Sequence, residues 1–80
     1  MDTKTKKVRR MLENMAPVDC VPFIQSFLLP ADEERYIIDH EANKKAIVEI
    51  ALENHVSVDT VHKKRRIGLC KMANSIQYKQ

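Results

Sequence analysis

The stretch "EIALENHVSVDTVHKKRR", residues 49 to 66, decides the fold of the C-terminal half of this chain. It begins acidic and apolar, and it ends in four consecutive basic residues. Ser57 lies between the two parts, and serine is a preferred residue for the N-terminal cap of a helix. The pattern predicts two helices joined by a short turn, of which the second is basic.

The turn and the second helix contain the residues that such a junction requires. Asn54 and His55 fall where the backbone needs a positive φ, which both residue types tolerate better than most. The Ser57 hydroxyl is placed to accept a backbone N–H near Thr60. Ala51 is small enough for the two helices to cross closely, and Val61 is expected to pack against the first helix. This outline is that of a helix-turn-helix.

Helical spacing of apolar residues predicts three more helices before this pair. A first helix is expected over residues 3–15, where Pro17 ends it. Asp19 would cap a second helix over residues 19–29, with Pro22 in its first turn. The third covers 31–42 with an acidic first turn, the fourth covers 43–54 with Asn43 as its cap, and the fifth runs from 58 to 76.

These elements predict an all-α fold, a small bundle of about five helices with a C-terminal helix-turn-helix, since no β pattern occurs. Residues 1–29 would form a helical pair that packs on or extends the helix-turn-helix of residues 30–80, giving one domain overall. Gly68 in the fifth helix suggests close backbone packing. Whether the apolar residues of the N-terminal pair face a core or a dimer partner is left open, and these are Met11, Met15, Phe23 and Phe27.

Charge is strongly segregated along the chain. Residues 1–10 carry five basic residues and one acid, residues 11–59 carry three basic residues and ten acids, and residues 60–80 carry six basic residues and no acid. Two basic ends around an acidic middle are better explained by contacts with binding partners than by the needs of folding. Solvated helix faces are the alternative, and composition alone does not choose between them.

Composition also narrows the function classes. Cys20 and Cys70 lie among apolar residues and predict reduced core or near-core thiols, with a disulfide between them as the alternative. No zinc-ligand spacing, catalytic pairing or glycine-rich phosphate loop occurs, so we expect no metal, no cofactor and no enzyme activity. No segment has the pattern of a secretory signal or of a membrane span. A cytoplasmic protein is therefore expected.

The residues Glu49-Ile50-Ala51, Ser57 and Thr60-Val61 have a spacing that resembles region 4 of bacterial sigma-70-type RNA polymerase sigma factors. Upstream, "LLPADEERYII" (28–38) resembles the segment that opens this region. Phage late-transcription regulators of the ArpU type have a similar C-terminal half. The output domain of LuxR-type regulators shares the core pattern and fits less well further on.

The chain also departs from the sigma pattern. Asn54 stands where leucine is usual, and His55 stands where glycine is usual. No segment resembles sigma region 2, so a complete sigma factor is not expected. Residues 1–29 match no motif.

The resemblance implies a DNA-binding transcriptional regulator of a bacterium or phage, with the fifth helix in the major groove of double-stranded DNA. In this role Val58, Asp59, His62, Lys63 and Arg66 would face base edges. Lys64 and Arg65 would serve phosphates or packing, and Lys44 and Lys45 would contact the DNA backbone. The candidate DNA-binding residues are thus Lys44, Lys45, Ser57, Val58, Asp59, His62, Lys63, Lys64, Arg65 and Arg66. The alternative is an adaptor that docks on RNA polymerase or another regulator without touching DNA.

Overall fold

The computed structural model describes the backbone of residues 3–79 and the side chains of residues 3–76. The described part of the chain is all-α and contains no strand. None of its helices has the length and apolar character needed to cross a membrane. Its elements are α1 (Thr3–Asn14), α2 (Pro17–Gln25), α3 (Ala31–Ile37), the π-helical segment η1 (Ile38–Ala42), α4 (Ile47–Glu53) and α5 (Val58–Lys79).

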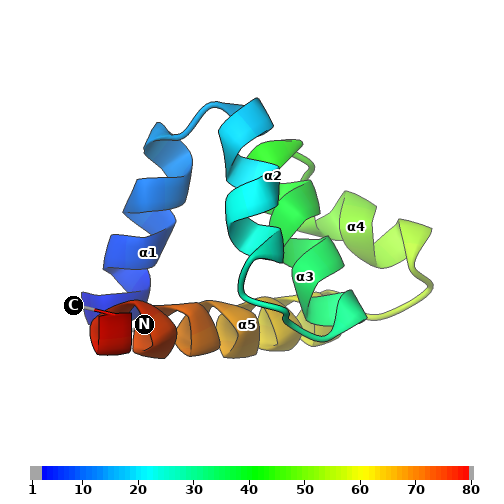
Figure 1. Cartoon of the computed structure of the whole chain (residues 1–80). Coiled ribbons are helices and arrows are strands. Elements are labelled where there is room, and N and C mark those ends of the chain that lie inside the picture. The colour runs from blue at the N-terminus through cyan, green and yellow to red at the C-terminus, as the bar shows by residue number, and fades with distance from the viewer. Residues whose placement is uncertain (1–2, 80) are drawn as a thin grey trace.

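Helix α5 lies along the bottom of the bundle in Figure 1, and α1, α3 and α4 pack on it. Its 22 residues span about 33 Å at 1.5 Å per residue, close to the longest extent of the molecule, 38 Å. Helix α1 packs over the C-terminal half of α5, while α3 and α4 pack toward its N-terminal half. One side of α5 therefore packs against the bundle, and most of the opposite side of residues 58–76 is exposed to solvent.

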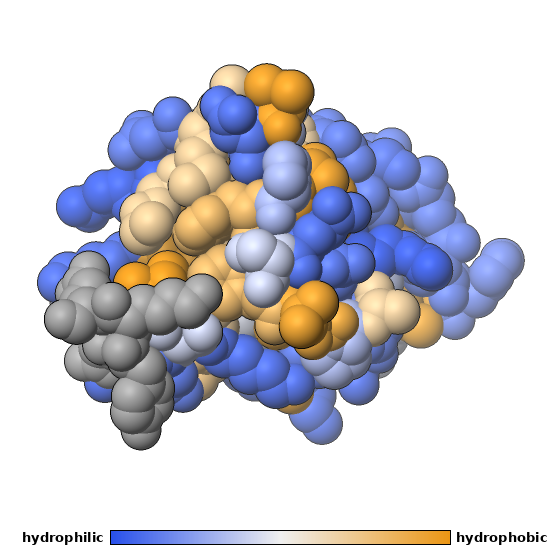
Figure 2. All heavy atoms as spheres, in the orientation of Figure 1, coloured by the Kyte–Doolittle hydropathy of each residue, from blue (hydrophilic) through white to orange (hydrophobic). Residues whose placement is uncertain are grey.

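The main core joins the N-terminal pair of helices to α5. Its buried residues come from α1, α2, the last residue of α3, η1 and α5. They are Val8, Leu12, Cys20, Ile24, Ile37, Ala42, Leu69, Met72 and Ala73. Met15, Phe23 and Phe27 pack against this cluster, whereas Met11 is 38% exposed. Apolar side chains also gather between α1 and α2 on the face seen in Figure 2. The N-terminal pair thus shares one core with the C-terminal helices.

A second cluster holds α3, α4 and the start of α5 together. Its buried members are Tyr36, Ile50, Ala51 and Val61, and Ile47 and Val56 pack against them. Val61 has no exposed surface and Ala51 is 4% exposed, so the positions predicted to lie between the two C-terminal helices do so. Burying the larger apolar side chains, Ile50 and Val61, stabilises the fold by about 1.5–3 kcal/mol each.

Gly68 permits the close approach of α3 and α5. A Cβ atom at this position would lie 2.6 Å from Ile37 Cδ1 and 3.4 Å from Glu33 Cβ. Both residues are buried on α3, so they have little room to move. The predicted role of Gly68 in close packing is confirmed. Glycine inside a helix is less stable than alanine by about 1 kcal/mol, and the close contact with α3 offsets this loss.

The predicted bounds of the second helix were wrong. Helix α2 begins at Pro17, two residues before the expected cap Asp19, because proline suits the first position of a helix. Ala16 precedes it without any side-chain cap, and Pro22 lies inside the helix. The helix ends at Gln25, and Leu28 adopts a φ of 55° and is 88% exposed, so it is not part of an apolar helix face.

The predicted fourth helix also began too early. Helix α4 starts at Ile47 after Ala46, and Asn43 closes the preceding π-helical segment by donating its N–H to the Ile38 carbonyl at 3.1 Å. Lys44 has a φ of 58°, a left-handed backbone that no helix continues. Propensity could not predict the π-helical segment, because its wider turn depends on packing. Lys44 and Lys45 therefore lie in a turn, not at the start of a helix.

The two cysteines differ in environment, which corrects the expectation that both lie in or near the core. Cys20 is buried and Cys70 is exposed, and both are free thiols. Burial raises the pKa of the Cys20 thiol, the nearby Glu41 carboxylate raises it further, and Lys44 partly opposes the rise. Cys20 thus stays protonated, and only the thiolate is a nucleophile.

We expect a thiol-specific chromogenic reagent at about pH 8 to label one cysteine of the native protein, Cys70, and to label the second only in denaturant. The Cys70→Ser variant should lose the fast reaction. Two equivalents that react at equal rates in the native state, or none, would contradict the assignment.

Candidate nucleic-acid interface

The segment between α4 and α5 has the predicted turn chemistry. The Thr60 N–H donates to the Ser57 hydroxyl at 3.1 Å, so Ser57 caps α5 as expected. His55 is the residue with positive φ, at 56°, whereas Asn54 keeps a φ of −99°. The departures from the sigma pattern at these two positions are therefore compatible with a tight connection between α4 and α5.

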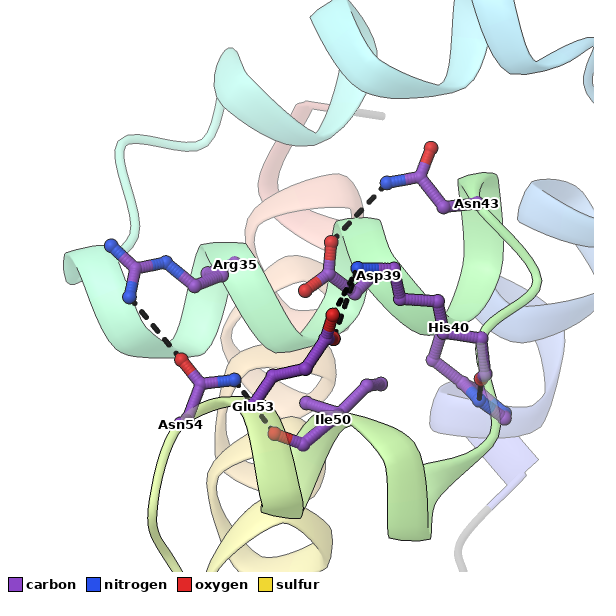
Figure 3. Close-up of polar contacts among 8 residues, drawn as sticks. Arg35, Asp39, His40, Asn43, Ile50, Glu53 and Asn54 are labelled. Atoms are coloured by element: carbon purple, nitrogen blue, oxygen red, sulfur yellow. Dashed lines mark hydrogen bonds and ion pairs between the residues drawn. The ribbon is translucent and has the colours of Figure 1, made fainter.

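Asn54 has a further role that the sequence did not reveal. Its side-chain amide donates to the Ile50 carbonyl at 2.7 Å and accepts a hydrogen bond from Arg35 of α3 at 3.3 Å (Figure 3). The side chain thus closes the C-terminal end of α4 and ties it to α3, since the last carbonyls of a helix lack partners within it. The turn is fixed relative to the rest of the bundle.

The exposed side of α5 brings together most of the residues that were expected to face base edges. Asp59, His62, Lys63 and Arg66 are all exposed and follow one another at i, i+3, i+4 and i+7, which places them on one face of the helix. Val58 lies at the start of the same helix and is 37% exposed. No carboxylate pairs with Lys63 or Arg66 among the described residues.

Lys64 is directed toward α3 and forms an ion pair there. Its Nζ lies 3.3 Å from Asp32 Oδ2. Desolvation raises the pKa of Asp32, but the hydrogen bond from the Glu33 N–H and the contact with Lys64 together outweigh it and hold that pKa below its usual value. The pair is more than a third exposed on both sides, so it contributes little to stability. Lys64 therefore packs on α3 at the edge of the exposed face.

Arg65 is buried and does not belong to the exposed surface. Its Nη2 donates to Glu41 Oε1 at 2.9 Å, and the two side chains are only 7% and 4% exposed. Arg9 of α1 approaches the same carboxylate oxygen, with 3.8 Å between Nε and Oε1. Of the two roles expected for Arg65, phosphate contact and packing, the structure supports packing. Arg65 is accordingly removed from the set of candidate DNA contacts.

Lys44 and Lys45 extend the basic surface into the turn before α4. Lys44 is exposed, whereas Lys45 donates from Nζ to both carboxylate oxygens of Glu53, at 3.0 and 3.1 Å (Figure 3). The hydrogen bond to Glu53, together with nearby carboxylates, raises the pKa of Lys45. Lys44 is therefore the more available of the two, and Lys45 would have to exchange partners to contact a phosphate.

The acidic first turn of α3 connects this helix to α5. Lys71 of α5 donates to both carboxylate oxygens of the buried Glu33, at 3.0 and 3.2 Å. With the pair between Asp32 and Lys64, this contact fastens α3 to α5 at two places. Sequence spacing gave no signal for these pairs, because they join residues more than thirty positions apart.

No group of three or more histidine, cysteine or acidic side chains among the described residues could hold a metal ion. In comparisons with known proteins, the chain matches no protein-family model, no curated protein and no solved structure. The function is therefore argued from the geometry of the α5 surface.

Proposed function

We propose that this protein binds double-stranded DNA by inserting the N-terminal half of α5 into the major groove. The observation that carries the proposal is the division of the basic run 63–66. Lys64 and Arg65 are engaged by acids of the bundle, while Lys63 and Arg66 project from the opposite side without an ion-pair partner in the described chain. Unpaired basic side chains on an exposed helix face are suited to bind base edges and phosphates.

The neighbouring residues fit the same role. Asp59 would repel phosphate but can accept a hydrogen bond from cytosine N4. Val58, in the first turn of α5, offers an apolar contact for a thymine methyl group. The major groove is about 12 Å wide and admits a single helix. Because the exposed face of α5 is not covered by any described element, the helix can approach the groove without rearrangement of the bundle.

The proposal includes the helix-turn-helix character of α4 and α5 and the resemblance to sigma region 4. The Ser57 cap, the positive φ of His55 and the buried Ala51 and Val61 support this interpretation. The role in transcription, in the cytoplasm of a bacterium or of a phage-infected cell, rests on the resemblance to sigma factors and ArpU-type regulators. Its target sequence would be read mainly by Lys63 and Arg66.

The test is the affinity of the protein for a random-sequence duplex, measured by fluorescence anisotropy at several salt concentrations. Each phosphate contact contributes about −0.9 to the slope of log K against log salt concentration. On a random-sequence duplex, where Lys63 and Arg66 have no target bases to read and contact phosphates together with Lys44, we expect a slope of about −3 or steeper. Undetectable binding at about 50 mM salt would overturn the proposal.

A protein-interaction adaptor is the second candidate, and one observation favours it. Val48 and Leu52 lie one turn apart on α4 and are 57% and 73% exposed, beside the acidic residue Glu49. Exposed apolar side chains flanked by charge are typical of protein contacts. The expected partner is a basic, apolar surface of RNA polymerase or of another regulator.

The two candidates respond differently to substitution. An adaptor should retain its protein partner when Lys63 and Arg66 are changed to glutamate, and it should lose that partner in the Val48→Ser/Leu52→Ser variant. A DNA-binding protein should show the reverse pattern toward DNA. Binding of each variant to a DNA duplex and to purified RNA polymerase, measured side by side, separates them.

A further inference from the structure

A basic hollow lies between α1 and the turn that precedes α4. It has a volume of about 310 Å³ and is lined by Arg9 and Glu13 of α1, by His40 and Glu41 of η1, and by the turn residues 44–46. A second hollow of about 280 Å³ continues along α1, where Lys6 and Arg10 join Arg9 and Glu13. The two hollows share Arg9 and Glu13, so they are adjacent, and together they are here called the α1 hollow.

The fold separates the basic residues of α1 into two sets. Lys6, Arg9, Arg10 and Glu13 follow at i, i+3, i+4 and i+7, so they share the face of α1 that borders the hollow. The opposite side of the helix buries Thr5, Val8 and Leu12. Lys4 and Lys7 are exposed and line neither hollow. The basic N-terminal run therefore supplies three basic residues to one site and leaves two outside it.

The net charge of the α1 hollow is positive, because its buried acid is already paired with basic side chains of the protein. Glu41 is almost fully buried and accepts from Arg65 at 2.9 Å, with Arg9 at 3.8 Å, so its charge is compensated within the protein. Lys45 is bonded to Glu53. This leaves Glu13 as the acid that opposes Lys6, Arg10 and Lys44 at the rim. A hollow of this charge attracts an anion with several acceptor oxygens, such as a phosphate.

The turn that carries Lys44 is held in place despite its unusual backbone. The Lys45 N–H donates to the Asp39 carbonyl at 2.9 Å, and the His40 ring nitrogen Nδ1 lies 2.9 Å from the Lys45 carbonyl (Figure 3). Lys44 nevertheless adopts a φ of 58°, which glycine would adopt at lower cost. The turn thus presents Lys44 at the hollow that this residue lines.

A row of α5 residues connects part of the proposed DNA surface to α1, the helix that borders the hollow. His62, Arg66, Leu69 and Ala73 follow at i, i+4, i+7 and i+11, which is one row along the helix. The first two are exposed, while Leu69 and Ala73 are buried in the cluster that includes Val8 and Leu12 of α1. Arg66 also directly follows Arg65, whose partner Glu41 lines the hollow. The same row of α5 is thus exposed at His62 and Arg66 and belongs to the cluster shared with α1 at Leu69 and Ala73.

We infer that the α1 hollow binds backbone phosphates of the same DNA duplex that α5 contacts, through Lys6, Arg10 and Lys44. The inference rests on the proposed function for the source of the phosphate. It gives α1, which lies outside the region that resembles sigma region 4, a direct part in DNA binding. The chemistry is that of guanidinium and ammonium donors on a phosphodiester, which carries no sequence information.

The test compares two double variants that each remove two positive charges from α1. Lys6→Gln/Arg10→Gln changes residues that line the hollow, and Lys4→Gln/Lys7→Gln changes exposed residues that do not. For DNA binding measured against salt concentration, we expect the first variant to flatten the log–log slope by about 1.8 and to weaken binding at least about tenfold at low salt. The second should change affinity less than about threefold, since its charges act only at long range.

The Lys44→Gln variant is an independent check from the other side of the hollow, and it should flatten the slope by about 0.9. Equal losses in the two α1 variants would overturn the inference, because net charge and not the hollow would then be responsible. Unchanged slopes in the Lys6/Arg10 and Lys44 variants, with Lys63 and Arg66 still required, would overturn it and leave the proposed function intact. A wild-type protein that fails to bind DNA at low salt, yet shows amide shifts at residues 6, 10 and 44 with inorganic phosphate, would overturn both the function and DNA as the source of the phosphate.

Discussion

The Lys63→Gln/Arg66→Gln variant is expected to lose DNA binding while it keeps the fold. Both side chains are exposed and have no ion-pair partner within the described chain, so their removal leaves no buried charge behind. On a random-sequence duplex each of these side chains acts as a phosphate contact, so the loss of both should flatten the log–log salt slope by about 1.8 and weaken binding at low salt at least about tenfold. Anisotropy at low salt measures the affinity, and thermal unfolding measures the stability.

The matched control is Lys64→Gln/Lys71→Gln, which removes the same charge from the same helix. These lysines pair with Asp32 and Glu33 of α3. We expect this variant to lower the melting temperature, because Glu33 is buried and loses its partner. Its DNA affinity should fall much less than that of the first variant. A control that loses as much affinity as Lys63→Gln/Arg66→Gln would show that charge, and not the geometry of the exposed face, governs binding.

Replacing Arg65 by methionine is expected to be the most damaging single change to stability. Glu41 is 4% exposed and its carboxylate would lose the guanidinium 2.9 Å away. Leaving one member of a buried ion pair uncompensated destabilises a protein by about 3–5 kcal/mol. Small domains often have a total free energy of unfolding near the low end of 5–15 kcal/mol. Denaturation in urea should therefore show a strongly reduced midpoint or a largely unfolded protein.

A second substitution should restore much of that stability. In the Glu41→Leu/Arg65→Met variant both charges are gone, and buried ion pairs can often be replaced by apolar residues of similar volume without loss. The Arg65 Nε is already buried without a hydrogen-bond partner in the described structure, so the native pair is not ideally satisfied. A double variant as unstable as Arg65→Met alone would contradict this account of Glu41 and Arg65. So would a single variant that loses less than about 1 kcal/mol.

Local sequence signals correctly predicted the features that depend on neighbouring residues, namely helix ends and buried helix faces. The spacing of Val8 and Leu12 placed α1 within one residue of its observed end, and Ser57 marked the start of α5 correctly. The buried positions of Ala51 and Val61 followed from the same periodicity. In each case the information lies within one or two helical turns, where hydrogen bonding and side-chain spacing act directly.

The sequence could not predict features that depend on contacts between residues far apart in the chain. Four basic residues in a row look equivalent, yet Asp32 and Glu41 engage Lys64 and Arg65 and leave Lys63 and Arg66 exposed. That division depends on how α3 and η1 pack against α5. The α1 hollow likewise exists only because the turn at Lys44 lies beside α1. The start of α2 differs from the prediction for a local reason, since Pro17 occupies the start of the helix that Asp19 was expected to cap.

The most direct test of the central claim is an amide-resolved NMR titration of the wild-type protein with a random-sequence duplex at low salt, repeated at higher salt. We predict shifts concentrated at residues 57–66 on α5 and in the turn around Lys44, which fade as salt rises. Little shift is expected on the outer face of α4 around Val48 and Leu52. An absence of shifts at low salt, or shifts confined to α4, would contradict the account and would direct the search to protein partners.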